Sequence, residues 1–165
     1  MPDLSVTARP QGTDRDERET PPELFRFITA RTGPLILDVC ATRANTKCDS
    51  FLSLENGHDG LAVPWGHNFW MNPPYSDVET WAYKAVNEAA GNKVRGVVLV
   101  PAATETAWWQ VLWNEACEVA FLAPRVRFLK DGVPMGSPPF GSAVFVLGPR
   151  LVTGPPRAEL LRWKP

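Results

Sequence analysis

The sequence predicts an α/β domain with a mainly parallel sheet that helices cover on both faces. Apolar runs at residues 35–40, 94–102 and 117–123 alternate with segments whose apolar residues are spaced three and four apart. With 165 residues, of which 44% are hydrophobic and 21% charged, the chain suits one core and is too short for two ordinary domains. We expect three parts along the chain: a flexible arm at 1–18, one folded domain at 19–150 and a C-terminal tail at 151–165.

The first half of the chain predicts one helix, one strand and a long loop. Thr20 is a good N-cap and Pro21 a good first helical residue for a short helix, which a Gly-Pro pair then ends. The compact run at 35–40 carries Asp38 near its end and suits a buried parallel strand. From 41 to 65 the pattern is irregular and polar, so we expect mostly loop, with at most one short strand or helical turn.

The second half alternates regularly between the two element types. A Ser-capped helix is expected after residue 76, and a helix capped by Thr104 or Thr106 follows later. The expected elements are strands at 67–71, 94–102, 117–123 and 141–148, and helices at 77–90 and 104–116. Ligands of such sheets bind at the C-terminal ends of the strands, where Asp38 and the segment from Asn72 to Tyr75 are expected.

Composition limits the compartment and the partners. The polar, charged N-terminus has no apolar segment of signal-peptide type, and no run approaches a membrane span, so we expect a cytoplasmic protein without a membrane partner. Cys40, Cys48 and Cys117 show no paired spacing and are interpreted as free thiols; we expect no metal site, since Cys40, Cys48 and His58 have no recognised ligand spacing. The net charge of −1 means that any DNA contact needs a local basic patch.

The segment Asn72-Pro73-Pro74-Tyr75 directly follows a predicted strand. The two prolines hold the backbone extended, so the Asn72 side-chain oxygen and a neighbouring carbonyl form a fixed pair of acceptors suited to an amino group with two hydrogens. Tyr75 adds a flat ring suited to stacking on a planar base. The alternative is a plain strand-to-helix junction with Ser76 as N-cap, which leaves the combination of Asn, two prolines and Tyr unexplained.

The chain resembles the phage-type (Dam-like) DNA adenine-N6 methyltransferases in the order of three segments, "ETPPELF", "LDVCAT" and "NPPYS". Softer matches are "DGLAVPW", "VVLVPAATETAWW" and "RVRFLKDG", so the resemblance runs from about Thr20 to Val146. It implies an abbreviated Rossmann-like methyltransferase fold at 19–150, S-adenosylmethionine as cofactor and adenine-containing DNA as partner. The segment "DVCATRANT" departs from the glycine-rich loop of many methyltransferases.

The resemblance also implies roles for individual residues. The implied catalytic residues are Asn72, Pro73, Pro74 and Tyr75, and the implied cofactor-binding residues are Thr20, Pro21, Asp38, Cys40, Ala41, Asp59 and Asn72. For Asp59 an ordinary turn role is an equal alternative. The basic residues Arg125, Arg127 and Lys130 are candidates for DNA binding, with a solvated strand edge as the alternative interpretation.

The expected activity is methyl transfer to the exocyclic amino group of a flipped-out adenine, in modification of phage or prophage DNA within the host-cell cytoplasm. Two alternatives remain at this point. One is methylation of another amino group, on an RNA base or a protein glutamine, and the other is an inactive protein that keeps the fold and binds ligands. The chain has no room for a large recognition domain, so we expect a monomer or weak homodimer that reads DNA through loops.

Overall fold

The computed structural model describes residues 15–149 and 154–165, which form a seven-stranded sheet flanked by helices. The strand order is β2-β1-β3-β4-β8-β5-β9, and β8 runs antiparallel to both of its neighbours whereas every other adjacent pair is parallel. The strands are β1 (Leu37–Asp38), β2 (Ser50–Phe51), β3 (Phe69–Met71), β4 (Gly96–Pro101), β5 (Ala116–Ala123), β8 (Ser142–Leu147) and β9 (Arg157–Arg162). The predicted α/β class with a mainly parallel sheet is confirmed.

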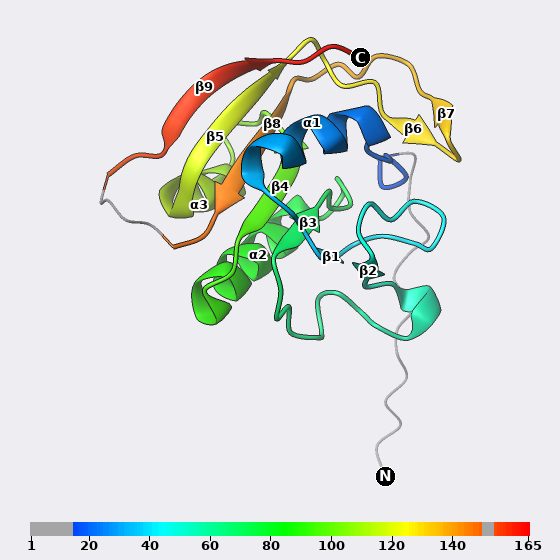
Figure 1. Ribbon diagram of the computed structural model, residues 1–165. Coiled ribbons are helices and arrows are strands. Elements are labelled where there is room, and N and C mark those ends of the chain that lie inside the picture. Colours follow the sequence, from blue (N-terminus) through cyan, green and yellow to red (C-terminus); the bar gives the residue numbers. More distant parts are fainter. Residues whose placement is uncertain (1–14, 150–153) are drawn as a thin grey trace.

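Helices cover both faces of this sheet. The helices are α1 (Pro22–Thr32), α2 (Val78–Asn92) and α3 (Ala107–Glu115), with a short 3₁₀ turn η1 (Leu54–Asn56) in the long loop. In Figure 1, α1 passes in front of the sheet, with α2 and α3 behind it. Leu24 and Ile28 of α1 pack in one core cluster, whereas the α2 and α3 residues Ala85 and Leu112 belong to a second cluster on the opposite face. The sheet is therefore the middle layer of three.

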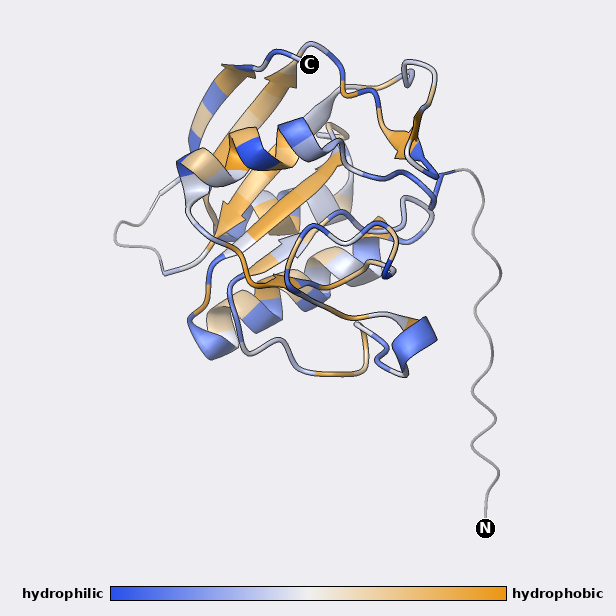
Figure 2. Cartoon of the chain, turned by 45° about the vertical axis from the view of Figure 1, so that its right-hand side comes forward, coloured by the Kyte–Doolittle hydropathy of each residue, from blue (hydrophilic) through white to orange (hydrophobic). Residues whose placement is uncertain are grey.

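The central strands are apolar because both of their faces are covered. Residues 96–100 of β4 are all buried, and Figure 2 shows the middle of the sheet in the hydrophobic colour. Gly96 allows the Phe69 ring of the neighbouring strand to lie directly against the backbone, since a Cβ at this position would lie 2.2 Å from Phe69 Cζ. Dense packing at this point holds β3, and the segment that follows it, against β4.

The helix starts differ in part from prediction. Thr106 caps α3 as expected, its hydroxyl accepting a hydrogen bond of 3.3 Å from the main-chain nitrogen of Trp109. The N-cap of α2 is Asp77 instead of Ser76, whose hydroxyl is bound elsewhere. The N-cap of α1 is Pro21, one residue later than predicted, and Thr20 makes no capping bond.

The two ends of the expected domain also differ. Residues 157–162, assigned by the sequence to a tail, form β9 and pair in parallel with β5 along its whole length. The edge position of β9 explains the difference, because Leu161 is its one buried residue and the strand carries no alternating apolar signal. At the other end, 1–14 lie outside the described residues, but 16–18 of the expected arm contact the domain.

A small hairpin forms a separate two-stranded sheet. It consists of β6 (Leu129–Lys130) and β7 (Val133–Pro134), joined by Asp131 and Gly132, which both have positive φ (51° and 75°). Glu19 pairs with Leu129 through two main-chain hydrogen bonds of 2.8 and 2.9 Å, so the start of the described chain lies beside the hairpin (Figure 1). Among the helices of the described chain, none has the length and hydrophobicity needed to cross a membrane.

Candidate active site

The predicted site segments meet at the C-terminal ends of β1 and β3. These strands are parallel neighbours, with Asp38 opposite Trp70 in the register. Cys40 lies two residues after Asp38, and Asn72 lies two residues after Trp70. The Cys40 thiol donates a hydrogen bond of 3.1 Å to the Asn72 carbonyl oxygen. Burial raises the pKa of the Cys40 thiol, and the nearby Asp38 carboxylate adds to this, so the thiol stays protonated and can donate. The sequence expectation that these two segments share one sheet edge is confirmed.

The Asn72 side chain forms a hydrogen bond through its amide nitrogen but not through its oxygen. Nδ2 donates a hydrogen bond of 2.6 Å to the main-chain carbonyl oxygen of Arg18, while Oδ1 is buried and has no partner. Pro73 and Pro74 follow without main-chain N–H groups, and the Pro74 carbonyl accepts from the Asp77 nitrogen at 3.1 Å, which leads directly into α2. A rigid backbone therefore presents a buried, unpaired acceptor.

Tyr75 lies in a cage of aromatic rings. Its ring makes edge contacts with Phe128 (centroids 5.9 Å apart, planes at 88°) and Phe140 (5.8 Å, 64°), and the Arg18 guanidinium lies over it. The hydroxyl is buried without a hydrogen-bond partner. Burial raises the pKa of Tyr75, with Arg18 opposing the shift, so the side chain is a neutral aromatic surface and no base.

Asp38 organises the loop after β1. Its Oδ2 accepts a hydrogen bond of 3.0 Å from the Lys47 main-chain nitrogen, and Asn45 Oδ1 accepts one of 2.7 Å from the Thr42 nitrogen. Burial raises the pKa of Asp38 to about 6, although hydrogen bonds from the Lys47 and Cys40 nitrogens and the Lys47 charge lower it. Carboxylate and amide side chains thus shape a loop that many methyltransferases shape with glycines.

A cavity of about 700 Å³ opens beside this loop. Its volume is in the range of sites for cofactor-sized ligands. It is lined by Asp16, Glu17, Val39, Cys40, Ala41, Thr42, Leu52, Ser53, Leu54, Glu55, Asp59, Gly60, Pro74, Ser76, Asp77 and Trp81. A hollow of about 30 Å³ shares Cys40 and Ala41 with it and adds Thr20, Asp38 and Asn72. Six of the seven predicted cofactor residues line one of these two spaces, and Pro21 lines neither.

Asp59 forms a turn and also lines the large cavity, so its role in cofactor binding stays a prediction. Its Oδ1 accepts a hydrogen bond of 2.9 Å from the Leu61 nitrogen, and its carbonyl accepts from Ala62 and Val63, so it forms the turn. It also lines the large cavity, together with Trp81 of α2. The Trp81 ring nitrogen is a buried donor without a partner.

Unpaired polar atoms gather at this site. In the part of the chain that the structure describes, six buried side-chain polar atoms have no hydrogen-bond partner. Four of them belong to Arg18, Thr20, Asn72 and Tyr75, and the Trp81 nitrogen is a fifth, at the cavity. Native proteins leave few such groups, so their concentration here indicates a place where a ligand supplies the missing partners.

Comparison with known proteins identifies the family of this chain. The family described as DNA N-6-adenine-methyltransferase (Dam) matches residues 7–144. The chain belongs to the Dam family. The DNA N-6-adenine-methyltransferase of Escherichia phage T1 is 33% identical over 110 residues, which cover 66% of this chain and 45% of that protein. The protein of the same name from Haemophilus phage HP1 is 29% identical over 122 residues, covering 72% and 69%. The chain therefore spans less than half of the phage T1 relative.

The predicted basic residues of this Dam family chain do not form one uniform cluster. Arg125 Nη1 donates a hydrogen bond of 3.2 Å to the Pro138 carbonyl and braces the loop that carries Phe140. Arg127 is exposed, and Lys130 forms an ion pair with Glu17. The three residues therefore have different surroundings, and a role in DNA contact stays a prediction for each.

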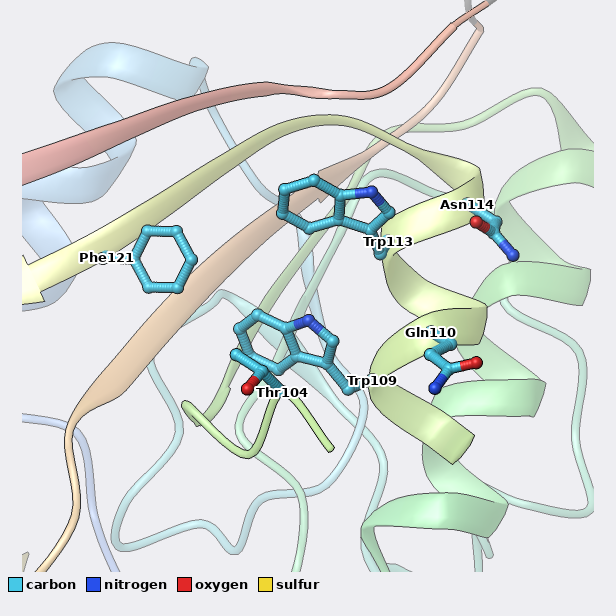
Figure 3. Close-up of a pocket in the computed structure, with 6 residues that line it drawn as sticks. All are labelled: Thr104, Trp109, Gln110, Trp113, Asn114 and Phe121. Carbon is cyan, nitrogen blue, oxygen red and sulfur yellow. The ribbon is translucent and has the colours of Figure 1, made fainter. Parts of the chain in front are cut away.

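A second hollow in the Dam family chain, of about 410 Å³, lies beside α3. Figure 3 shows Trp109 and Trp113 extending from α3 on the side where Phe121 of β5 lies. Thr104, Gln110 and Asn114 complete the lining, and none of the six residues is ionisable. This hollow shares no lining residue with the large cavity and offers no group for acid–base chemistry, so the sheet edge with Asn72 is the candidate active site.

Sequence reasoning missed several residues of the site. Asp16 and Arg18 lie in the expected arm, Phe128 and Phe140 surround Tyr75, and Trp81 was assigned only to a helix face. The aromatic partners come from segments distant in the sequence, and no local pattern marks them. For Arg18 one weak signal exists, its position two residues before the "TP" segment.

Proposed function

We propose that this chain is an S-adenosylmethionine-dependent DNA methyltransferase that methylates the exocyclic amino group of a flipped-out adenine. The observation that carries the proposal is the buried, unpaired Oδ1 of Asn72, whose amide nitrogen is already engaged by the Arg18 carbonyl. Membership of the Dam family and the likeness to two phage proteins named for this activity support it. The proposed setting is modification of phage or prophage DNA in the host cytoplasm, on a Rossmann-like methyltransferase fold.

The residues at the large cavity fit the cofactor. Asp59 and the unpaired Trp81 nitrogen offer an acceptor and a donor at the large cavity, and Asp38 adds a second acceptor in the adjoining small hollow, as a ligand with amino, hydroxyl and carboxylate groups requires. Thr20 adds a buried hydroxyl that has no partner. When bound, S-adenosylmethionine supplies an electrophilic methyl group on a positively charged sulfur. The chain's part is to hold that group and the acceptor nitrogen in line.

The nucleophile is the adenine amino nitrogen, and the protein prepares it. Its lone pair is delocalised into the ring, and acceptors at Asn72 Oδ1 and the Pro73 carbonyl favour the pyramidal form in which the pair is available. They also stabilise the positive charge that develops on nitrogen during transfer. With Asn72 Oδ1 and the Pro73 carbonyl oriented toward it, the amino nitrogen would be held ready to accept a methyl group and would then give up one proton to water.

Tyr75 provides the surface for the base. An adenine inside a duplex is out of reach, so it must leave the stack and enter the pocket. Stacking on the neutral Tyr75 ring would offset part of the lost base stacking. The raised pKa of Tyr75 suits this role, because it keeps the hydroxyl protonated and the ring neutral, as a stacking surface among aromatic side chains requires.

The test is transfer of labelled methyl from S-adenosylmethionine to unmethylated genomic DNA, with nucleoside analysis of the product. We expect N6-methyladenine with the wild type and none with Asn72→Ala, whose cofactor affinity by calorimetry should stay within about tenfold, or about 1.4 kcal/mol. The matched control is Asn114→Ala, an exposed asparagine of α3 away from the site. Transfer to RNA or protein alone, or cofactor binding without any transfer, would contradict the proposal.

A further inference from the structure

The Arg18 side chain fills the space in front of the Tyr75 ring. Its guanidinium carbon lies 6.0 Å from the ring centroid of Tyr75, 5.8 Å from that of Phe128 and 5.3 Å from that of Phe140. The buried Nε has no hydrogen-bond partner, and the guanidinium lies over three aromatic rings, an arrangement that favours cation–π attraction. A flat charged group therefore occupies a slot built from aromatic rings.

The main chain around Arg18 is fastened on both sides. Before it, the Asp16 carboxylate accepts hydrogen bonds from the Ser76 nitrogen (2.9 Å) and hydroxyl (2.8 Å). After it, Glu19 pairs with Leu129 through two main-chain bonds, and its carboxylate accepts from the hairpin nitrogens at 131 and 132. The backbone is thus held in place, whereas the Arg18 side chain can leave the slot by rotation about its own bonds.

The segment from Asp16 to Glu19 also pairs with a basic side chain of the hairpin. Glu17 forms an ion pair with Lys130, one of the residues proposed to contact DNA. Both side chains are about half exposed (46% and 41%), so the pair is weak and a phosphate can compete for Lys130. Two neighbouring residues of one short segment, Glu17 and Arg18, thus contact Lys130, a candidate for DNA contact, and Tyr75, the proposed stacking ring.

We propose that the Arg18 side chain is a built-in occupant of the target-base slot, which the flipped adenine displaces while the Arg18 carbonyl keeps the Asn72 amide oriented. The inference rests on the proposed function, because it takes Tyr75 as the stacking surface. A purine and a guanidinium are both planar and both stack on aromatic faces, so they cannot share the covered face of Tyr75. Base entry and Arg18 departure are then one exchange, and the carbonyl contact does not have to break.

The exchange affects apparent affinity in a defined way. A ligand that binds only the open form has its apparent dissociation constant raised by the inverse of the open fraction. Removing the guanidinium makes the slot permanently open and leaves the backbone bond to Asn72 in place. The kinetic test therefore compares Arg18→Ala with the wild type and with Arg18→Lys, which keeps the charge but lacks the planar stacking group.

For Arg18→Ala we expect the KM for unmethylated genomic DNA to fall roughly fivefold while kcat changes less than twofold, with Arg18→Lys in between. Arg26→Ala, which removes an exposed arginine from α1, is the control for lost positive charge and should leave both constants unchanged. A higher KM in Arg18→Ala would mean that Arg18 helps to hold DNA, and a loss of kcat alone would make it a positioning residue. Either result, or no change in KM, would overturn the proposal.

A measurement without turnover makes the test independent of activity. In ¹H–¹⁵N spectra of the free wild-type protein, the Nε–H signal of Arg18 should be shifted upfield by the ring currents of its three aromatic neighbours, and Arg18→Lys identifies the signal by its loss. A signal at the ordinary arginine position would show an empty slot and overturn the proposal even if Arg18→Ala lowers KM. If the wild type does not methylate DNA, the proposed function is contradicted, and the role of Arg18 with it. If the wild type is active but the Arg18 signal is not shifted, only the role of Arg18 is contradicted.

Discussion

The carboxylate of Asp38 accepts a hydrogen bond of 3.0 Å from the main-chain nitrogen of Lys47, nine residues further along the chain. This bond closes the loop after β1 and fixes Cys40 and Ala41 against the cavity. The loop is therefore shaped around a buried charge, and its structure and ligand affinity should depend on the ionisation of Asp38.

The first prediction concerns pH. Burial raises the pKa of Asp38 to about 6, so the residue becomes a full acceptor as the pH rises through that value. We expect S-adenosylmethionine affinity, measured by calorimetry, to increase between about pH 5 and pH 7 in the wild type. Asp38→Asn should bind more weakly and show no such increase. An unchanged pH profile in the variant would show that another group controls binding.

The same shift predicts a pH dependence of folding stability with the opposite sign. Between the ordinary value of 3.8 and about 6, the folded state holds a proton on Asp38 that the unfolded state has lost. The contribution of this group to the free energy of unfolding is therefore complete below pH 3.8 and falls as the pH rises through 6. Urea unfolding of the wild type and Asp38→Asn across this window should show the difference in slope; parallel curves would contradict it.

Tyr75 offers a matched pair of variants. Tyr75→Phe removes a buried hydroxyl without a partner, so we expect the free energy of unfolding to rise by about 1 kcal/mol and kcat/KM to stay within about threefold. Tyr75→Ala removes the stacking ring, and kcat/KM for DNA should fall roughly 10- to 100-fold. Equal activity of the two variants would exclude a stacking role for the ring.

The turn role of Asp59 and its proposed role in cofactor binding can be separated by substitution. Asp59→Asn keeps an oxygen for the Leu61 nitrogen but loses the charge, so we expect near wild-type thermal stability with cofactor affinity lowered about tenfold. Asp59→Ala loses the turn bond as well and should be less stable by about 1 kcal/mol. Full cofactor affinity in Asp59→Asn would leave the turn as its only role.

Salt dependence can rank the basic residues. Arg127 is exposed, and its replacement by alanine should reduce the slope of log affinity for DNA against log salt concentration by about 1. Arg125→Ala should instead lower thermal stability, since it removes the brace to Pro138, and leave the slope almost unchanged. The reverse pattern would identify Arg125 as the phosphate contact.

Sequence patterns predict the elements of this fold in which buried apolar residues recur at a regular spacing or form a continuous run. The five buried apolar residues of α2 recur at helical spacing, and β4 is a continuous apolar run, so both could be recognised directly. The capping of α3 by Thr106 and the meeting of the Asp38 and Asn72 segments follow from local rules and from the geometry of parallel sheets. The β6–β7 hairpin carried an Asp131-Gly132 turn signal, but its strands of two residues gave no alternation to confirm it.

What could not be predicted depends on contacts between distant segments. The cage around Tyr75 joins the start of the described chain, the end of β3 and the loop around β6, and nothing in "RDERE" shows that one arginine lies between aromatic rings. The mixed direction of the sheet is similar, because the insertion of β8 between β4 and β5 is decided by tertiary packing. The candidate site was thus predictable at its central motif of asparagine and two prolines, and not at the residues that surround it.

The last strand also has a consequence for handling the protein. A chain shortened at residue 150 would lose β9 and uncover residues 118–123 of β5, leaving main-chain N–H and C=O groups of that edge unpaired. Such an edge can add strands from other molecules. The charged residues of β9, Arg157, Glu159 and Arg162, discourage this in the intact chain, so the shortened protein should precipitate or form intermolecular sheet at concentrations where the full chain stays dispersed.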